Sequence, residues 1–219
     1  MRRVYAFKAM PRRRSLTQAA IAAAALAVID RDGVAGLSMR AVAAELGTGT
    51  MSLYRYVADR EELERWVVDL VLADVDPEAP AGVPWPEQVT VLVERVRQAV
   101  AVHPAVVPLL LIHRHTSPHS WRWSETVLGL LTEAGFTGRR RVVAFRCLLA
   151  YIVGALQAES LGPLAGPGTE ALAQLASAGY PVLAETARSA GGVPPEEEFG
   201  RGLAIVLHGF RAMLAEPSP

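Results

Sequence analysis

The residues with the most suggestive chemistry lie close together, between positions 38 and 57. Hydroxyl groups and arginines are frequent there, and these side chains donate hydrogen bonds to phosphate oxygens and to base edges. The side chains available to face outward, including one arginine just beyond the segment, are Arg40, Thr50, Met51, Tyr54, Arg55, Tyr56 and Arg60. The pattern therefore indicates contact with nucleic acid.

A second group of residues combines three imidazoles, those of His113, His115 and His119, with Trp121 and Trp123. The spacing His-x-His-x₃-His could hold a metal ion. However, the segment contains a proline and serines, so the imidazoles need not converge. A loop that lines a ligand pocket is the alternative that we favour, and we assign no metal and no cofactor.

Charge is divided unevenly along the chain, although the 22 basic and 22 acidic side chains sum to zero. Residues 1–60 carry ten positive and four negative side chains, a net charge of +6, whereas residues 61–219 carry twelve and eighteen, a net charge of −6. Such asymmetry is typical of a basic binding module joined to a second domain. Double-stranded DNA is the partner that this distribution predicts.

The elements that position the 38–57 segment are predicted to be short helices. Thr17 is a suitable N-cap for an alanine-rich helix that ends near Asp30, and Ser38 is a suitable cap for the next one. Gly47 permits a left-handed turn before a second short helix over 50–57. Two short helices joined by such a turn form a helix-turn-helix, whose second helix enters the major groove. The alternative is a pair of ordinary core helices.

The remainder of the chain also reads as helices. The expected segments are 87–102, 105–113, 121–134, 138–160, 169–177, 180–189 and 195–215. A proline-rich linker or loop over 76–86 precedes them. Alternating apolar runs with hairpin turns are absent from the sequence, so we predict an all-α fold.

Composition excludes several classes of protein. The chain has 219 residues, 51% apolar and 20% charged, which is typical of a globular protein. A single cysteine, Cys147, excludes an intramolecular disulfide, and we expect it to be buried in a helix. An enzyme is the main functional alternative, but the chain lacks a nucleophile elbow, a phosphate-binding loop and a zinc-protease motif. We therefore expect no enzymatic activity.

The N-terminus could be mistaken for an export signal, because Arg13-Arg14-Ser15-Leu16 precedes the apolar run 19–29. A signal needs a small-residue cleavage site after that run, and the run is too short to span a bilayer. Export is thus the disfavoured alternative, and we expect a cytoplasmic protein without a membrane span. Residues 1–14 should form a basic, disordered arm.

The motif resembles that of the tetracycline-repressor (TetR) family. The matching residues are Leu37-Ser38-Met39-Arg40, Ala43, Leu46-Gly47, Leu53-Tyr54-Arg55-Tyr56-Val57, Arg60 and Leu63. The resemblance is close over 15–75 and looser beyond. It implies a three-helix helix-turn-helix DNA-binding domain over 15–75, and a larger C-terminal helical domain over 87–215 for effector binding and dimerisation.

What the resemblance implies for function is a homodimer that binds a palindromic operator, represses transcription and dissociates when a small-molecule effector binds. By position, Arg40, Thr48, Gly49, Thr50 and Met51 would face base edges. The residues implied to contact phosphates are Ser38, Ser52, Tyr54, Tyr56 and Arg60. Gly49 has no side chain, so base recognition would depend on few groups.

The resemblance also implies that helices 138–160 and 195–215 pair with their counterparts in a second copy; the alternative is that they are ordinary core helices. We interpret the three arginines at 139–141 as a solvated helix start; the alternative is a second phosphate contact. Candidate residues for the effector pocket are His113, Trp121, Trp123, Phe145, Gln157 and Glu159.

Overall fold

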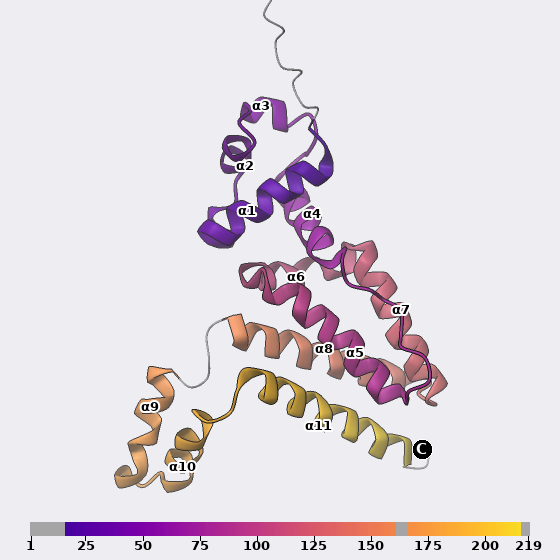
Figure 1. Ribbon diagram of the computed structural model, residues 1–219, viewed down its shortest axis with the longest axis vertical. Coiled ribbons are helices and arrows are strands. Elements are labelled where there is room, and N and C mark those ends of the chain that lie inside the picture. Colours follow the sequence, from indigo (N-terminus) through magenta and orange to yellow (C-terminus); the bar gives the residue numbers. More distant parts are fainter. Residues whose placement is uncertain (1–15, 161–165, 216–219) are drawn as a thin grey trace, which may run out of the picture.

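A computed structural model describes residues 16–160 and 166–215, and within these ranges the chain contains helices and no strands. The predicted all-α fold is confirmed. The basic arm expected over 1–14 lies outside the described residues. The first four helices form one end of the molecule (Figure 1): α1 (Gln18–Gly36), α2 (Met39–Glu45), α3 (Thr50–Leu53) and α4 (Arg60–Leu72).

A second group of helices forms the body below this end. It comprises α5 (Trp85–Ala101), the 3₁₀ turn η1 (Pro104–Val106), α6 (Val107–His113), the turn η2 (Arg114–Thr116), α7 (Pro118–Glu133) and α8 (Gly138–Ser160). α4 extends from the first group into the second and packs against α5, α6 and α7. A movement of α4 therefore affects both groups.

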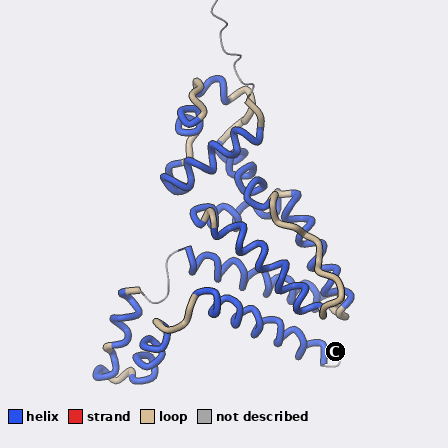
Figure 2. The backbone as a smooth tube through the Cα atoms, in the orientation of Figure 1, coloured by secondary structure: helices blue, strands red, loops and turns tan. Residues whose placement is uncertain are grey.

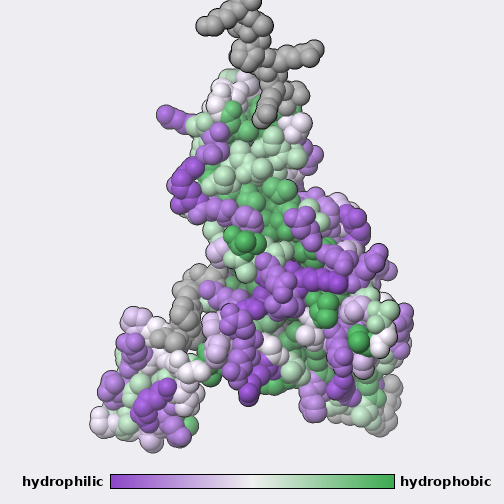
Figure 3. Space-filling model, viewed as in Figure 1, coloured by the Kyte–Doolittle hydropathy of each residue, from purple (hydrophilic) through white to green (hydrophobic). Residues whose placement is uncertain are grey.

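The last helices differ in how well they are packed. α11 (Pro195–Ala215) runs beside α8 at the edge of the body. The lobe, which we define as α9 (Pro167–Ala173), η3 (Leu175–Ala178) and α10 (Pro181–Ala190), packs mainly on itself. The tube drawing shows it projecting from the body (Figure 2), and the space-filling view shows it as a separate protrusion (Figure 3).

Local signals in the sequence explain where the helices begin. The side chains of Thr17 and Ser38 accept hydrogen bonds from amides three residues ahead, at 3.2 and 3.1 Å, as predicted for N-caps. Asp59 caps α4 in the same way at 2.8 Å, and the amide of Ala58 donates to the carboxylate of Glu62 at 2.7 Å. Pro118 begins α7 at its first position, where its missing N–H costs nothing, so this helix starts earlier than expected.

Two helix ends near the motif differ from the prediction. α1 extends to Gly36, but Gly33 has a φ of 72°, so the chain bends there, beyond the expected end near Asp30. The second short helix ends at Leu53 instead of Val57. The amide of Tyr56 binds the carbonyl of Leu53, only three residues back, at 2.9 Å, and this tightens the helix into a turn.

The core joins helices that are far apart in sequence. Phe136 is fully buried, and its ring contacts those of Trp85 and Phe210 edge-on, with centroids 6.1 and 5.8 Å away. These contacts fix α5 and α11 against the end of α7. The 76–86 segment also packs closely, because Arg95 donates to the carbonyls of Asp76 and Glu78 at 3.0 and 2.6 Å.

One side of α8 remains open. Ala144, Leu148 and Ile152 face the core, whereas Val143 is 51% exposed. Cys147 is exposed on this open side, so the expectation that it is buried was wrong. The apolar character of a helix does not reveal which of its faces is covered.

Length and composition alone would let one described helix, Gly138–Glu159, cross a membrane. The bent pair Trp85–Ala101 and Pro104–Thr116 passes the same test when its two helices are taken together. Core helices of soluble proteins pass it as well, and α8 contributes buried residues to the bundle.

Candidate DNA-binding interface and ligand cavities

The helix-turn-helix has the geometry that its sequence predicts. Gly47 has a φ of 62°, which turns the chain from α2 towards α3. Val42, Ala43 and Leu53 are at most 1% exposed and form the contact between the helices. The seam is thus filled by the motif's own apolar residues, and its polar side chains remain outside.

All eleven predicted DNA-binding residues lie on or next to this motif, and all are exposed or half-buried. Met51 is 80% exposed, and Tyr54 and Tyr56 are 49% and 43% exposed. Arg40 and Arg55 form no ion pair or side-chain hydrogen bond with any other residue of the described ranges. Two guanidinium groups are therefore available to an external anion such as phosphate. The remaining residues of the set are Ser38, Thr48, Gly49, Thr50, Ser52 and Arg60.

Arg60 differs from the other two arginines because it is bound within the chain. Its Nε lies 2.8 Å from Glu64 Oε1, and its Nη2 donates to the carbonyl of Val34 at 2.9 Å. The i,i+4 spacing of arginine and glutamate could have indicated the first contact from the sequence. The second contact spans 26 residues, and no local pattern indicates it.

Histidines of the body bind carboxylates of the first group of helices. His103 Nδ1 lies 2.8 Å from Asp30 Oδ2 on α1. Asp69 on α4 accepts from Ser117 and lies 2.7 Å from His119 Nδ1. Burial opposes ionisation of Asp69, but hydrogen bonds from Ser117 and His119 outweigh it and lower its pKa.

The most buried of these pairs joins α6 to α4. His113 Nε2 lies 2.9 Å from Glu64 Oε2, with only 4% and 14% of the two side chains exposed. Burial opposes ionisation of Glu64, but hydrogen bonds from His113 and Arg60 and their attraction to the carboxylate lower its pKa. The histidines thus bind separate carboxylates. Among residues 16–160 and 166–215, no cluster of three histidine, cysteine or acidic side chains could hold a metal.

Comparison with known families identifies both parts of the chain. Residues 21–64 match the family described as bacterial regulatory proteins, tetR family. Residues 76–214 match the family described as tetracyclin repressor-like, C-terminal domain.

The chain belongs to the TetR family.

Individual relatives agree with this assignment. The chain is 32% identical over 216 residues to the HTH-type transcriptional repressor DrrR1 of Streptomyces coeruleorubidus, with 92% of this chain and 80% of the relative covered. The structure of apo ActR from Streptomyces coelicolor matches with a TM-score of 0.80 and 28% identity, covering 93% of this chain and 98% of ActR. A structure of ActR in complex with actinorhodin matches with a TM-score of 0.79, at 27% identity and with 91% and 97% covered. This TetR-family chain is accordingly a DNA-binding transcriptional regulator and not an enzyme.

The larger cavity of this TetR-family regulator lies between α5, α8 and the start of α11, with a volume of about 870 Å³. Three alanines and one glycine of α8 form one wall, and Ala190 and Val193 close the side next to the lobe. Arg97 binds Glu159 at 3.0 Å and lies 4.9 Å from the centroid of the Phe199 ring. The cavity thus combines an apolar wall with a few charged groups, as ligand sites do.

The six predicted pocket residues do not gather around this cavity. Glu159 lines it, whereas His113 binds Glu64 on α4. Trp123 is buried and donates its indole N–H to the carbonyl of Leu92 at 3.0 Å. The others lie outside the cavity lining: Trp121 is 56% exposed, and Phe145 and Gln157 are half-buried. Of the six predicted residues, Glu159 alone lines this cavity.

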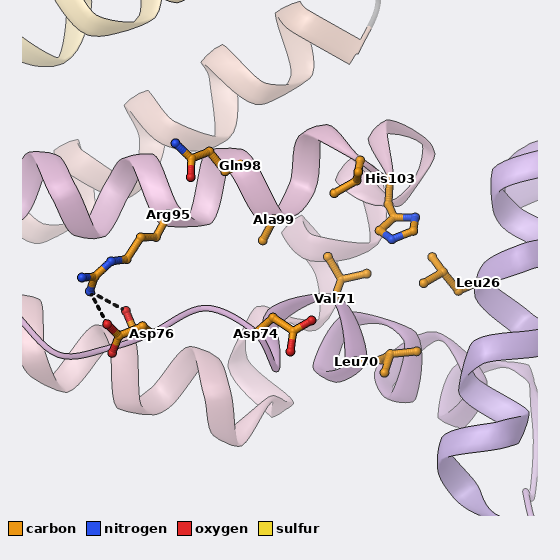
Figure 4. A pocket seen from close by; sticks show the side chains of 10 residues that line it. Leu26, Leu70, Val71, Asp74, Asp76, Arg95, Gln98, Ala99 and His103 are labelled. Atoms are coloured by element: carbon orange, nitrogen blue, oxygen red, sulfur yellow. Dashed lines mark hydrogen bonds and ion pairs between the residues drawn. The ribbon is translucent and has the colours of Figure 1, made fainter.

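A second, shallower cavity of about 680 Å³ lies where the two groups of helices meet (Figure 4). Leu26 and His103 stand at one end, and Arg95 and Asp76 stand joined at the other. Asp74 lies on the wall opposite α5. The cavity lies between α1 and α5, and His103, which lines it, also contacts Asp30 on α1.

Proposed function

We propose that this regulator is a homodimeric repressor that acts in the cytoplasm, binds a palindromic operator and is released by a small-molecule effector. The observation that carries the proposal is the outward face of the helix-turn-helix. There, two guanidinium groups, Arg40 and Arg55, have no partner within the described part of the chain. A face with unpaired cations and exposed hydroxyls is complementary to a phosphate backbone.

Base recognition is proposed for the start of α3, because helices of this kind enter the major groove N-terminus first. Arg40, Thr48, Gly49, Thr50 and Met51 would face base edges. Ser38, Ser52, Tyr54 and Tyr56 would bind phosphates, which fixes register without reading sequence.

Dimerisation through α8 and α11 is supported by the apolar surface that these two helices leave uncovered. Val143 and Ile205 are 51% and 73% exposed, and Cys147 lies beside Val143 on α8. Other apolar residues of the pair, such as Ile152 and Leu203, are already buried within the chain, so they belong to its core. A C₂ dimer would bring two recognition helices to two half-sites of one operator.

The effector site that we propose is the 870 Å³ cavity between α5, α8 and α11. Its position next to the proposed dimer surface would allow an occupant to alter how two copies pack. The ligand-bound ActR structures support a small organic molecule as the class of effector.

DNase footprinting on the DNA upstream of the gene tests operator binding. A protected palindrome, bound by a species with twice the chain mass in sedimentation, is the expected result. Weak binding without sequence preference would contradict the proposal. A thermal-shift screen of small molecules, followed by the footprint with each hit, tests release.

Two substitutions separate the proposed contacts. Tyr54→Ala should weaken binding to all sequences, because it removes a phosphate contact. Thr50→Ala should change base preference at one position in each half-site. An unchanged preference after Thr50→Ala would show that the assigned register is wrong.

A further inference from the structure

A continuous chain of contacts runs from the body to the entrance of the helix-turn-helix. It begins at His113 on α6, which lies 2.9 Å from one carboxylate oxygen of Glu64. The other oxygen of Glu64 accepts from Arg60 at 2.8 Å. Arg60 in turn donates to the carbonyl of Val34 at 2.9 Å. Four residues thus connect α6, α4 and the end of α1.

Val34 lies in the short segment between the bend at Gly33 and the start of α2. It follows Gly33, where the chain bends, and its carbonyl also accepts from the amide of Leu37 at 3.2 Å. Ser38, the cap of α2, comes next after Leu37. Fixing the Val34 carbonyl therefore fixes the direction in which the chain enters the DNA-binding motif.

Both carboxylate oxygens of Glu64 are occupied by hydrogen bonds, one with Arg60 and one with His113. Its side chain is 14% exposed and uses one oxygen for each of them. The neighbouring charges do not compete for it, because Glu61 binds Arg65 at 2.8 Å and Arg114 donates to the carbonyl of Leu111. A buried carboxylate that loses one of these donors would be left partly unpaired.

We propose that Glu64 and Arg60 are positioning residues: Glu64 aligns the guanidinium of Arg60 on the Val34 carbonyl, and the pair sets the orientation of the helix-turn-helix relative to α6. Arg60 then acts within the protein and does not bind a phosphate, in contrast to what the sequence suggested. The inference rests on the proposed function in one respect, that the chain binds an operator.

Lysine and glutamine variants at position 60 distinguish the two roles. A lysine can replace arginine at a phosphate because it keeps the charge, but a single ammonium cannot reproduce the planar fork that reaches Glu64 and Val34 together. The probe is a duplex selected from random DNA by the wild-type chain, measured by fluorescence anisotropy at several KCl concentrations. Arg55→Gln, which removes an exposed arginine without a partner among the described residues, is the matched control.

We expect Arg60→Lys and Arg60→Gln to weaken operator binding equally, by about tenfold, with the slope of log K against log[KCl] unchanged. The slope is negative, and Arg55→Gln should make it less steep by about one, since one phosphate contact is lost. Glu64→Gln should weaken binding about as much as Arg60→Gln, although it removes a negative charge, and the double variant should be no weaker than either single one. The opposite result is that Arg60→Lys binds like the wild type while Arg60→Gln makes the slope less steep by about one. Arg60 then binds a phosphate, and the inference is overturned.

Hydrogen exchange measures the same contact without DNA. The peptide covering residues 31–40 should exchange faster in Arg60→Lys and Glu64→Gln than in the wild type, and unchanged exchange would overturn the inference. A wild-type chain that selects no sequence would instead contradict the proposed function, and the exchange result would still decide whether Arg60 holds Val34.

Discussion

Replacing Gly202 by alanine is expected to destabilise the protein, although alanine is the better helix former. An added Cβ would lie 2.6 Å from the hydroxyl of Tyr151 and 2.9 Å from its Cε2. Tyr151 cannot move away freely, because its hydroxyl donates to the carbonyl of Phe199 at 2.5 Å. Overpacking of this kind costs about 1–3 kcal/mol, and the helix propensity gained returns about 1 kcal/mol. The net loss should be about 1 kcal/mol, or about 2–4 °C in Tm for a protein of this size.

Gly129→Ala is the matched control, because Gly129 lies inside α7 and nothing stands within 4 Å of an added Cβ. This variant should gain about 0.5–1 kcal/mol. Urea unfolding followed by circular dichroism measures both variants, and Tyr151→Phe combined with Gly202→Ala tests the cause, since removal of the hydroxyl should reduce the penalty. Equal stabilisation by the two alanines would refute the argument that Tyr151 requires a glycine opposite it.

Three further predictions concern single contacts. Asp59→Ala should lower the free energy of unfolding by about 1 kcal/mol in urea titrations, because the N-cap of α4 is lost; an unchanged midpoint would contradict this. Trp123→Phe should cost about 1–2 kcal/mol in the same assay, since the hydrogen bond from the buried indole N–H to the carbonyl of Leu92 is lost, whereas the exposed Trp121→Phe should cost less. The pKa of Asp69 is lowered in the folded state, so its contribution to stability is present above about pH 4 and is lost as the pH falls through the folded value. Asp69→Asn should accordingly lose less stability than the wild type between pH 5 and pH 3, and parallel losses would show that Asp69 is not responsible.

Features decided by neighbouring residues were predictable from the sequence. The caps Thr17, Ser38 and Asp59 act on amides three residues ahead, and Gly47 turns the chain by itself. The position of the helix-turn-helix, the all-α fold and the TetR family follow from such local patterns.

Features decided by packing were not predictable. The contact between His113 and Glu64 joins residues 49 positions apart, and the charge run at the start of α4 does not reveal it. Cys147 was expected to be buried because its helix is apolar, but the covered face of α8 is the one that carries Leu148. The histidines at 113 and 119 looked like one cluster, yet each binds a different carboxylate on α4.

The lobe of α9 and α10 has a consequence for the kinetics of ligand exchange. Only Ala184 and Ala187 are buried in it, so it has almost no apolar core, and segments of this kind open locally at a small free energy. Ala190, the last residue of the lobe, and Val193, just after it, line the larger cavity, while the opposite wall belongs to α8, which packs into the bundle through Ala144, Leu148 and Ile152. One wall of the cavity is therefore rigid and the other compliant. At the proposed effector site we therefore expect ligands of different lengths to enter by displacing the lobe, at a cost far below that of unfolding the bundle.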